Sequence, residues 1–254
     1  MTAQGRRVLR INFAAALLLL PCAAVPAQQR IPPGLVALSD IDPSIRQDMR
    51  YAGPDNFTGR PLPGYGRGAC WLYRDAALAL KRVQADVSAR GLSLKVYDCY
   101  RPARAVAAMV RWAAGPERKD TLRFYPALEK RRLLALGYIA SRSAHSRGVA
   151  IDLTLVPRDG SPPAPYDSAA RYGSCTAERN KRAPDESIDM GTGFDCFDSK
   201  SRTRTTGLTA QQHVNRMLLV DAMRRRGFHN YAREWWHFTF PAADARQRYD
   251  FPIR

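Results

Sequence analysis

The segment that most constrains the fold is a decapeptide, Ser-Ala-His-Ser-Arg-Gly-Val-Ala-Ile-Asp, at residues 143–152. It leads into a run that predicts a β-strand over residues 149–156, where successive side chains point to opposite faces. The odd-numbered residues form an aliphatic row, so Asp152 lies on the other face and needs a partner. His145 lies just before the strand, and Gly148 allows a turn through which the imidazole and the carboxylate can meet.

A second histidine and a second acid occur far downstream, in Glu-Trp-Trp-His at residues 234–237. Residues three apart in a strand face opposite sides, so Glu234 should lie on a loop or bulge just before a strand. His145, Asp152 and His237 then form a two-histidine, one-carboxylate set with an open position, which is typical of catalytic zinc. Such zinc lowers the pKa of its bound water to about 7, and Glu234 is expected to act as general base. The remaining two histidines are expected to be structural: His213 and His229.

The rest of the chain predicts an α+β fold, with a small antiparallel sheet flanked by helices and zinc at one edge of the sheet. The expected elements are a helix from an Asp75 cap to Gly91, a strand over residues 92–96, helices over residues 102–114 and near 127–136, a helix from a Thr209/Gln212 capping box to Gly227, and a strand over residues 235–240. The first strand delivers Asp98, Tyr100 and Arg101 to its carboxyl end. Residues 28–70 predict an ordered arm with little regular structure, and residues 157–190 predict an insertion or a long surface loop.

Residues 1–27 predict a secretory signal peptide, with a basic head, an apolar run and small residues for cleavage. The apolar stretch over residues 11–25 is interrupted and falls short of the roughly 18 residues that span a bilayer, so an uncleaved anchor is disfavoured. Lipidation of Cys22 is disfavoured because Pro21 stands where a small residue is needed. We expect a periplasmic or secreted protein whose domain covers residues 28–254, without a transmembrane segment after cleavage.

Four cysteines remain after removal of the signal, an even number in a chain bound for an oxidising compartment. Three connectivities exist. We favour Cys70 with Cys99 and Cys175 with Cys196, because the second pair would close a Pro- and Ser-rich excursion. Each such loop would stabilise the fold by roughly 3 kcal/mol. No pair has C-x-x-C spacing, which argues against a cysteine zinc cluster.

The composition is that of a folded globule, with 45% hydrophobic and 25% charged residues. The net charge is +17, and loss of the three signal arginines leaves +14. Basic clusters can attract anionic polymers of the envelope, although solvated surface is the simpler interpretation; they lie at residues 130–132, 179–182, 200–204 and 224–226. None has the interleaved aromatic side chains or the fold signature of nucleic-acid binding, so nucleic acid is not an expected partner.

These patterns resemble those of a known enzyme group. Ser-x-His-x-x-Gly-x-Ala-x-Asp followed by Glu-x-x-His is similar to the zinc peptidases of the D-Ala-D-Ala metallopeptidase group, which includes D,D-carboxypeptidases, endolysins and the D-Ala-D-Ala dipeptidases associated with vancomycin resistance. Further matches favour the dipeptidase branch: Tyr51-Ala52, Asp55 to Gly59, Tyr97 to Pro102, His145 to Leu155, Gly193 to Asp195, Glu234 to His237 and Phe251-Pro252. They cover most of the chain beyond about Ile41.

The resemblance implies hydrolysis of a small D,D-dipeptide with one zinc per chain, held by His145, Asp152 and His237, and with Glu234 as the base. The pattern alone does not distinguish zinc from other divalent ions, because supply and intrinsic preference decide occupancy.

The resemblance also implies that Arg101 stabilises the oxyanion. A fixed guanidinium in a dry pocket can lower the barrier by about 3 kcal/mol; a structural ion pair with Asp98 is the other interpretation. By the same resemblance Asp195 and Tyr51 help to hold the substrate's free amino group, and Ser143 lines the pocket. A carboxylate there suits an enzyme restricted to dipeptides, because a longer substrate presents an amide and leaves the charge unpaired.

The chain departs from this family pattern in three ways. It has a predicted export signal and four further cysteines, the stretch between Val156 and Met190 is long, and the residues after Asp195 differ. These departures concern the rim of the pocket. They keep open a peptidoglycan D,D- or L,D-carboxypeptidase, which needs an open amino end, and a non-catalytic module that binds the cell wall.

Overall fold

The protein is described by a computed structural model that covers residues 1, 31–116, 119–242 and 245–253. Its main sheet has five strands in the order β2-β4-β5-β7-β6, namely Arg46–Gln47, Leu92–Asp98, Ala150–Pro157, His237–Thr239 and His229–Asn230. All neighbouring pairs are antiparallel except β2 with β4. β1 (Leu35–Ala37) and β3 (Trp71–Tyr73) form a separate antiparallel pair. The predicted α+β class is confirmed, with one parallel pair at the sheet border.

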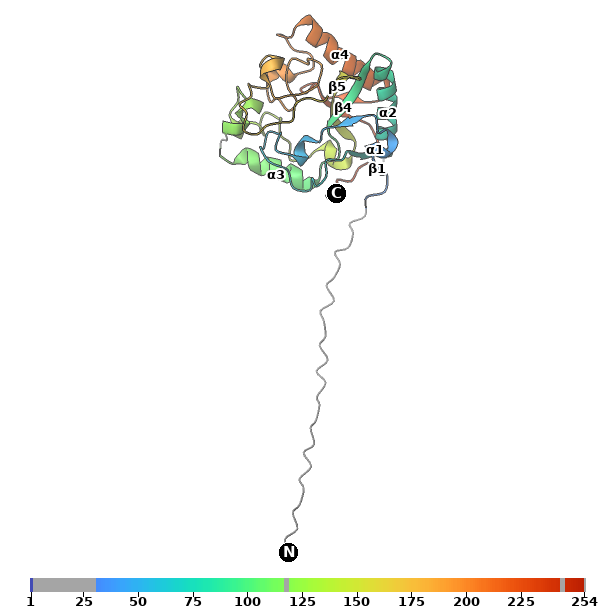
Figure 1. The fold of residues 1–254 in the computed structure, drawn as a ribbon, viewed down its shortest axis with the longest axis vertical. Coiled ribbons are helices and arrows are strands. Elements are labelled where there is room, and N and C mark those ends of the chain that lie inside the picture. Colours follow the sequence, from blue (N-terminus) through green and yellow to red (C-terminus); the bar gives the residue numbers. More distant parts are fainter. Residues whose placement is uncertain (2–30, 117–118, 243–244, 254) are drawn as a thin grey trace.

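The helices α2 (Arg74–Ser88) and α4 (Ala210–Arg225) pack beside the sheet, and both lie near β4 in Figure 1. One core joins them to the aliphatic face of the strands, and it includes Leu80, Val83, Leu94, Val96, Leu153, Leu155, Leu219 and Met223. α1 (Leu38–Ile41) adjoins α2, whereas α3 (Ala103–Ala114) lies on the other side of the molecule in an aromatic core with Tyr51, Phe57, Tyr100, Trp112 and Phe251.

The predictions of the helices and of their capping residues are confirmed only in part. The Thr209/Gln212 capping box is present, with both reciprocal hydrogen bonds. Asp75 is not a cap: α2 begins at Arg74, and Asp75 lies in the first turn, where the helix dipole favours an acid. The prediction of a helix near residues 127–136 is wrong, because the segment forms only a 3-10 turn, Lys130–Arg132, and further turns. It buries too few apolar side chains to stabilise a helix before Gly137 turns the chain with φ 77°.

The predictions for the strands, for residues 31–70 and for the disulfides are confirmed in full or in part. The strand over residues 92–96 extends to Asp98, while the last strand is shorter than expected and begins at His237. Residues 31–70 contain only short elements, as expected, although β1 and β2 were missed. Both disulfides, Cys70–Cys99 and Cys175–Cys196, are those favoured. The predicted signal and Cys22 lie outside the described residues, apart from Met1. None of the helices in the part of the chain that the structure describes has the length and apolar character of a membrane span.

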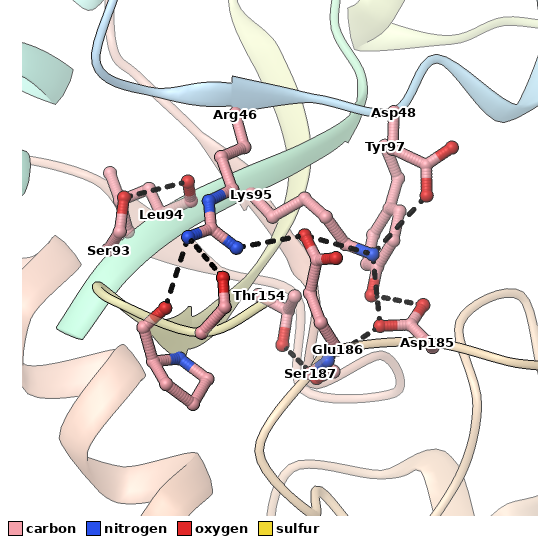
Figure 2. Close-up of polar contacts among 12 residues, drawn as sticks. Arg46, Asp48, Ser93, Leu94, Lys95, Tyr97, Thr154, Asp185, Glu186 and Ser187 are labelled. Atoms are coloured by element: carbon pink, nitrogen blue, oxygen red, sulfur yellow. Dashed lines mark hydrogen bonds and ion pairs between the residues drawn. The ribbon is translucent and has the colours of Figure 1, made fainter. Parts of the chain in front are cut away.

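The long loop, residues 158–190, packs against the sheet through part of its length. Its segment 185–188 runs beside β4 and β5, where the Ile188 amide donates to the Leu155 carbonyl at 2.9 Å. Figure 2 shows the polar contacts there. Lys95, whose side chain is only 2% exposed, lies 3.0 Å from an Asp185 carboxylate oxygen and 3.3 Å from one of Asp48. The charge on Lys95 can be buried because the loop supplies carboxylates.

We expect Asp185→Asn to destabilise the fold. Burial alone would raise the pKa of Asp185, but Arg50 and Lys95 outweigh it and lower that pKa. The stabilisation is therefore complete above the unfolded pKa of about 3.9 and is lost as pH falls through the lower folded value. At pH 7 the free energy of unfolding, measured by urea denaturation, should fall by roughly 2 kcal/mol, the usual contribution of hydrogen bonds to a charged group. Asp159→Asn, in an exposed pair with Arg158, is the control and should change nothing. Equal stability of the two variants at pH 7 would contradict this role of Asp185.

Candidate active site

The site lies at the border of the sheet where β4 ends and β5 and β7 begin. His145 belongs to a 3-10 turn, Ala144–Arg147, that precedes β5. The Ser143 hydroxyl caps this turn by accepting from the His145 amide at 3.2 Å. Gly148 follows with φ 71°, and an added Cβ there would overlap the Leu35 side chain. Glycine is therefore required to turn His145 toward the strand.

The three residues expected to bind metal do meet. Asp152 and His237 are directly opposite each other on β5 and β7, with the His237 Nδ1 2.8 Å from the Asp152 Oδ1. The His145 Nε2 is 3.2 Å from the His237 Nδ1 and 3.3 Å from the Asp152 Oδ1. One donor atom from each lies within 4.8 Å of the others. Two imidazoles and a carboxylate converging on one point form a donor set that fits zinc.

The surroundings keep these donors in their binding forms. The His145 Nδ1 lies 2.6 Å from the Cys99 carbonyl, so it is assigned as the donor and the Nε2 lone pair faces the other ligands. Burial would raise the pKa of Asp152, but the His145 and His237 imidazoles hold it well below its usual range.

Glu234 lies in the turn before β7, as the spacing predicts, and its Oε2 is 3.9 Å from the His237 Nδ1. Its amide donates to the Tyr231 carbonyl, which holds the turn closed. Burial raises the pKa of Glu234 to about 7. A carboxyl group with that pKa can both take and return a proton near neutral pH.

Arg101 makes an ion pair and also faces the site. Its Nε donates to the Asp98 Oδ2 at 2.8 Å, and its second terminal nitrogen lies 3.4 Å from the Asp152 Oδ2. The guanidinium is also 4.9 Å above the centre of the Tyr51 ring. The Tyr65 hydroxyl donates to the other Asp98 oxygen at 2.5 Å. The ion pair with Asp98 is therefore present, and it fixes a guanidinium that also lines the cavity; stabilisation of an oxyanion by Arg101 stays a prediction.

The three proposed substrate-binding residues line the same cavity, of about 200 Å³. The Tyr51 hydroxyl donates to the Asp195 Oδ2 at 2.7 Å, and Ser143 lies at the rim near His145. Burial, and next the Asp152 carboxylate, raise the pKa of Asp195 well above its ordinary value. Its backbone has φ 54°, among the described residues the one non-glycine in the left-handed region. A bound cation would favour the charged form of Asp195.

Sequence reasoning missed some of the lining residues. Arg142 lines the cavity beside Ser143, and Met109, Phe197, Tyr231 and the segment Gly137 to Ala140 are also part of its walls. The position of Arg142 next to the decapeptide could have indicated it; the others come from segments whose mutual approach no local pattern shows. His213 and His229 are not part of the metal-binding group, as expected.

The chain is similar in sequence to known proteins. The family model described as D-ala-D-ala dipeptidase matches residues 32–166 and 173–253. A D-alanyl-D-alanine dipeptidase of Enterococcus faecalis is 35% identical, covering 81% of this chain and 90% of that protein, and one of Enterococcus faecium is 33% identical over 87% of this chain and 98% of that protein. A solved vancomycin-resistance D,D-dipeptidase in complex with a D-Ala-D-Ala phosphinate analogue aligns with 83% of this chain and 67% of that chain, at 19% identity and a TM-score of 0.31, too low to carry an argument. By the extent of the family match and by these identities, the chain belongs to the D-Ala-D-Ala dipeptidase family of metallopeptidases.

Proposed function

We propose that the protein is a zinc-dependent dipeptidase that hydrolyses D-alanyl-D-alanine or a closely related D,D-dipeptide. The observation that carries the proposal is the approach of His145, Asp152 and His237 within 4.8 Å at a small cavity that Glu234 and Arg101 also line. The names of the relatives support the same substrate class.

The residues divide the chemistry among them. His145, Asp152 and His237 would hold zinc, which polarises a carbonyl and makes water more acidic when it is bound. Glu234 takes the proton of the attacking water and returns it to the departing amine, for which a pKa of about 7 is suited. Arg101, fixed by Asp98, donates to the carbonyl oxygen as negative charge develops there.

Charged side chains of both signs in the cavity lining support a dipeptide substrate. Asp195 and Tyr51 would bind the free ammonium group, which restores the charge that burial disfavours on Asp195. Arg142 is the second guanidinium of the cavity lining and would bind the terminal carboxylate. A blocked amino group would leave the Asp195 charge unpaired.

The test is a comparison of D-Ala-D-Ala with an acylated tripeptide that ends in D-Ala-D-Ala, followed through the release of D-alanine. We expect a clear preference for the free dipeptide in kcat/KM. Preference for the blocked substrate would instead favour the carboxypeptidase assignment, and hydrolysis of neither would favour a wall-binding module that does not use Glu234 and Arg101.

Asp195→Asn should raise KM for D-Ala-D-Ala by about tenfold or more with a smaller change in kcat, because an ion pair to the ammonium group is replaced by a neutral contact. Steady-state kinetics of the purified variant measure this, and the acylated tripeptide provides a control that lacks the ammonium group. An unchanged KM for the free dipeptide would remove Asp195 from substrate binding.

We also propose that the protein acts in the periplasm or is secreted. The signal pattern over residues 1–27 supports export, and two buried disulfides suit an oxidising compartment. The positive charge of the chain supports loose association with anionic envelope polymers.

A further inference from the structure

Each disulfide includes a cysteine that is adjacent in sequence to a residue of the candidate active site. Cys99 directly follows Asp98 and lies two residues before Arg101, and Cys196 directly follows Asp195. The partner cysteines come from distant segments: Cys70 precedes β3, and Cys175 belongs to the long loop. Each covalent link therefore lies within two residues of a side chain that lines the cavity, Arg101 for the first and Asp195 for the second.

The first disulfide, Cys70–Cys99, holds the backbone behind a metal ligand. Cys99 is fully buried, and its carbonyl is the acceptor, at 2.6 Å, of the hydrogen bond that orients the His145 ring. The next residues are bonded on both sides, with the Tyr100 amide donating to the Trp71 carbonyl and the Arg101 amide to the His145 carbonyl. A shift of Cys99 would move the acceptor that fixes the tautomer and direction of His145.

The second disulfide, Cys175–Cys196, holds the backbone beside the proposed ammonium-binding residue. Asp195 has φ 54°, a conformation that L-residues rarely adopt and that the surroundings must enforce. Cys196 is fully buried, and Cys175 is itself fixed because its amide donates to the Arg123 carbonyl and its carbonyl accepts from the Gly193 amide. The link therefore fixes the residue that directly follows the left-handed position.

We propose that the two disulfides position separate halves of the site: Cys70–Cys99 positions the metal-binding half through His145, and Cys175–Cys196 positions the substrate-binding half through Asp195. The inference rests on the proposed function, because it assigns zinc to His145 and the ammonium group to Asp195. None of the four cysteines touches the reacting atoms, so all are positioning residues.

The test compares two double variants, Cys70→Ala/Cys99→Ala and Cys175→Ala/Cys196→Ala, so that each is the matched control of the other. Zinc affinity is measured on the metal-free proteins by competition with a chromophoric chelator, and kcat and KM are measured with D-Ala-D-Ala at saturating zinc. Loss of the first disulfide should lower zinc affinity by about tenfold or more, the usual effect of disturbing a partner of a ligand histidine. Loss of the second should leave zinc affinity within about twofold and raise KM by about tenfold.

Leu219→Ala, in the buried core between α4 and the sheet, controls for lost stability without a change near the site. It should lower Tm and leave zinc affinity and KM unchanged. The proposal is overturned if both folded double variants keep wild-type zinc affinity and KM. It is also overturned if zinc affinity falls and KM rises in both double variants in proportion to the loss of Tm, and Leu219→Ala shows the same dependence on Tm.

Two provisions keep the result decisive. If an alanine pair does not fold, Cys70→Val/Cys99→Ala or Cys175→Val/Cys196→Ala refills the buried volume and enters the same assays. The zinc measurement needs no substrate, so a wild-type protein that binds zinc and does not hydrolyse the dipeptide would overturn the proposed function and leave the effect on the metal-binding half measurable.

Discussion

Removal of zinc will abolish hydrolysis of D-Ala-D-Ala, and His237→Ala will do the same at any practical zinc concentration. His237 would supply one of three donor atoms that lie within 4.8 Å, and without it only His145 and Asp152 remain, one fewer than the three protein ligands typical of catalytic zinc. We expect kcat/KM to fall by at least about 10³-fold, since a bound metal ion lowers the barrier by several kcal/mol. Metal content and D-alanine release are measured before chelation, after chelation and after zinc is restored.

His213→Ala is the matched control, because His213 is an exposed residue of α4 outside the metal-binding group. It should retain zinc and full activity. Activity that persists in a protein shown to be free of metal would exclude the zinc mechanism, and so would a His237→Ala variant that binds zinc and turns over at the normal rate.

Glu234→Gln will retain zinc and lose turnover. The change keeps the size of the side chain and removes the carboxylate that lies 3.9 Å from His237 and whose pKa is raised to about 7 by burial. A general base typically contributes 10² to 10⁴ in rate, so kcat should fall by about 10³-fold while KM changes little.

The comparison for Glu234→Gln is Glu178→Gln, an exposed acid of the long loop. Zinc content, kcat and KM of Glu178→Gln should equal those of the wild-type protein. Normal turnover of Glu234→Gln with zinc bound would show that another group takes the proton.

Local patterns were sufficient to predict most of the candidate site. The decapeptide at residues 143–152 contains a turn, the beginning of β5 and two of the three candidate metal donors, so that the pair could be recognised without the fold. The expectation that Glu234 precedes the last strand follows from the two-residue period of a strand alone, and the structure agrees. The capping box at Thr209 is likewise a local motif with both of its bonds within four residues.

The structural features that could not be predicted from the sequence depend on contacts between distant segments. The sequence alone suggests that Lys95 faces solvent from a half-exposed strand. In the structure the long loop buries it, and the carboxylate of Asp185, 90 positions away, pairs with its charge. The helix expected near residues 127–136 has suitable residues and lacks a surface to bury them against. The left-handed backbone of Asp195 leaves no mark in the sequence, because only its surroundings select it.

Because Asp152 pairs with His237 across β5 and β7, the geometry of the candidate metal site depends on the register of these two strands. A slip by one residue would place His237 opposite Ile151 or Leu153 and turn its imidazole toward the packed helices. Insertions or deletions inside these strands should therefore be forbidden in functional homologues. Lining residues outside these strands, such as Arg142, are not bound by this pairing, so the lining can change while the candidate metal donors keep their positions.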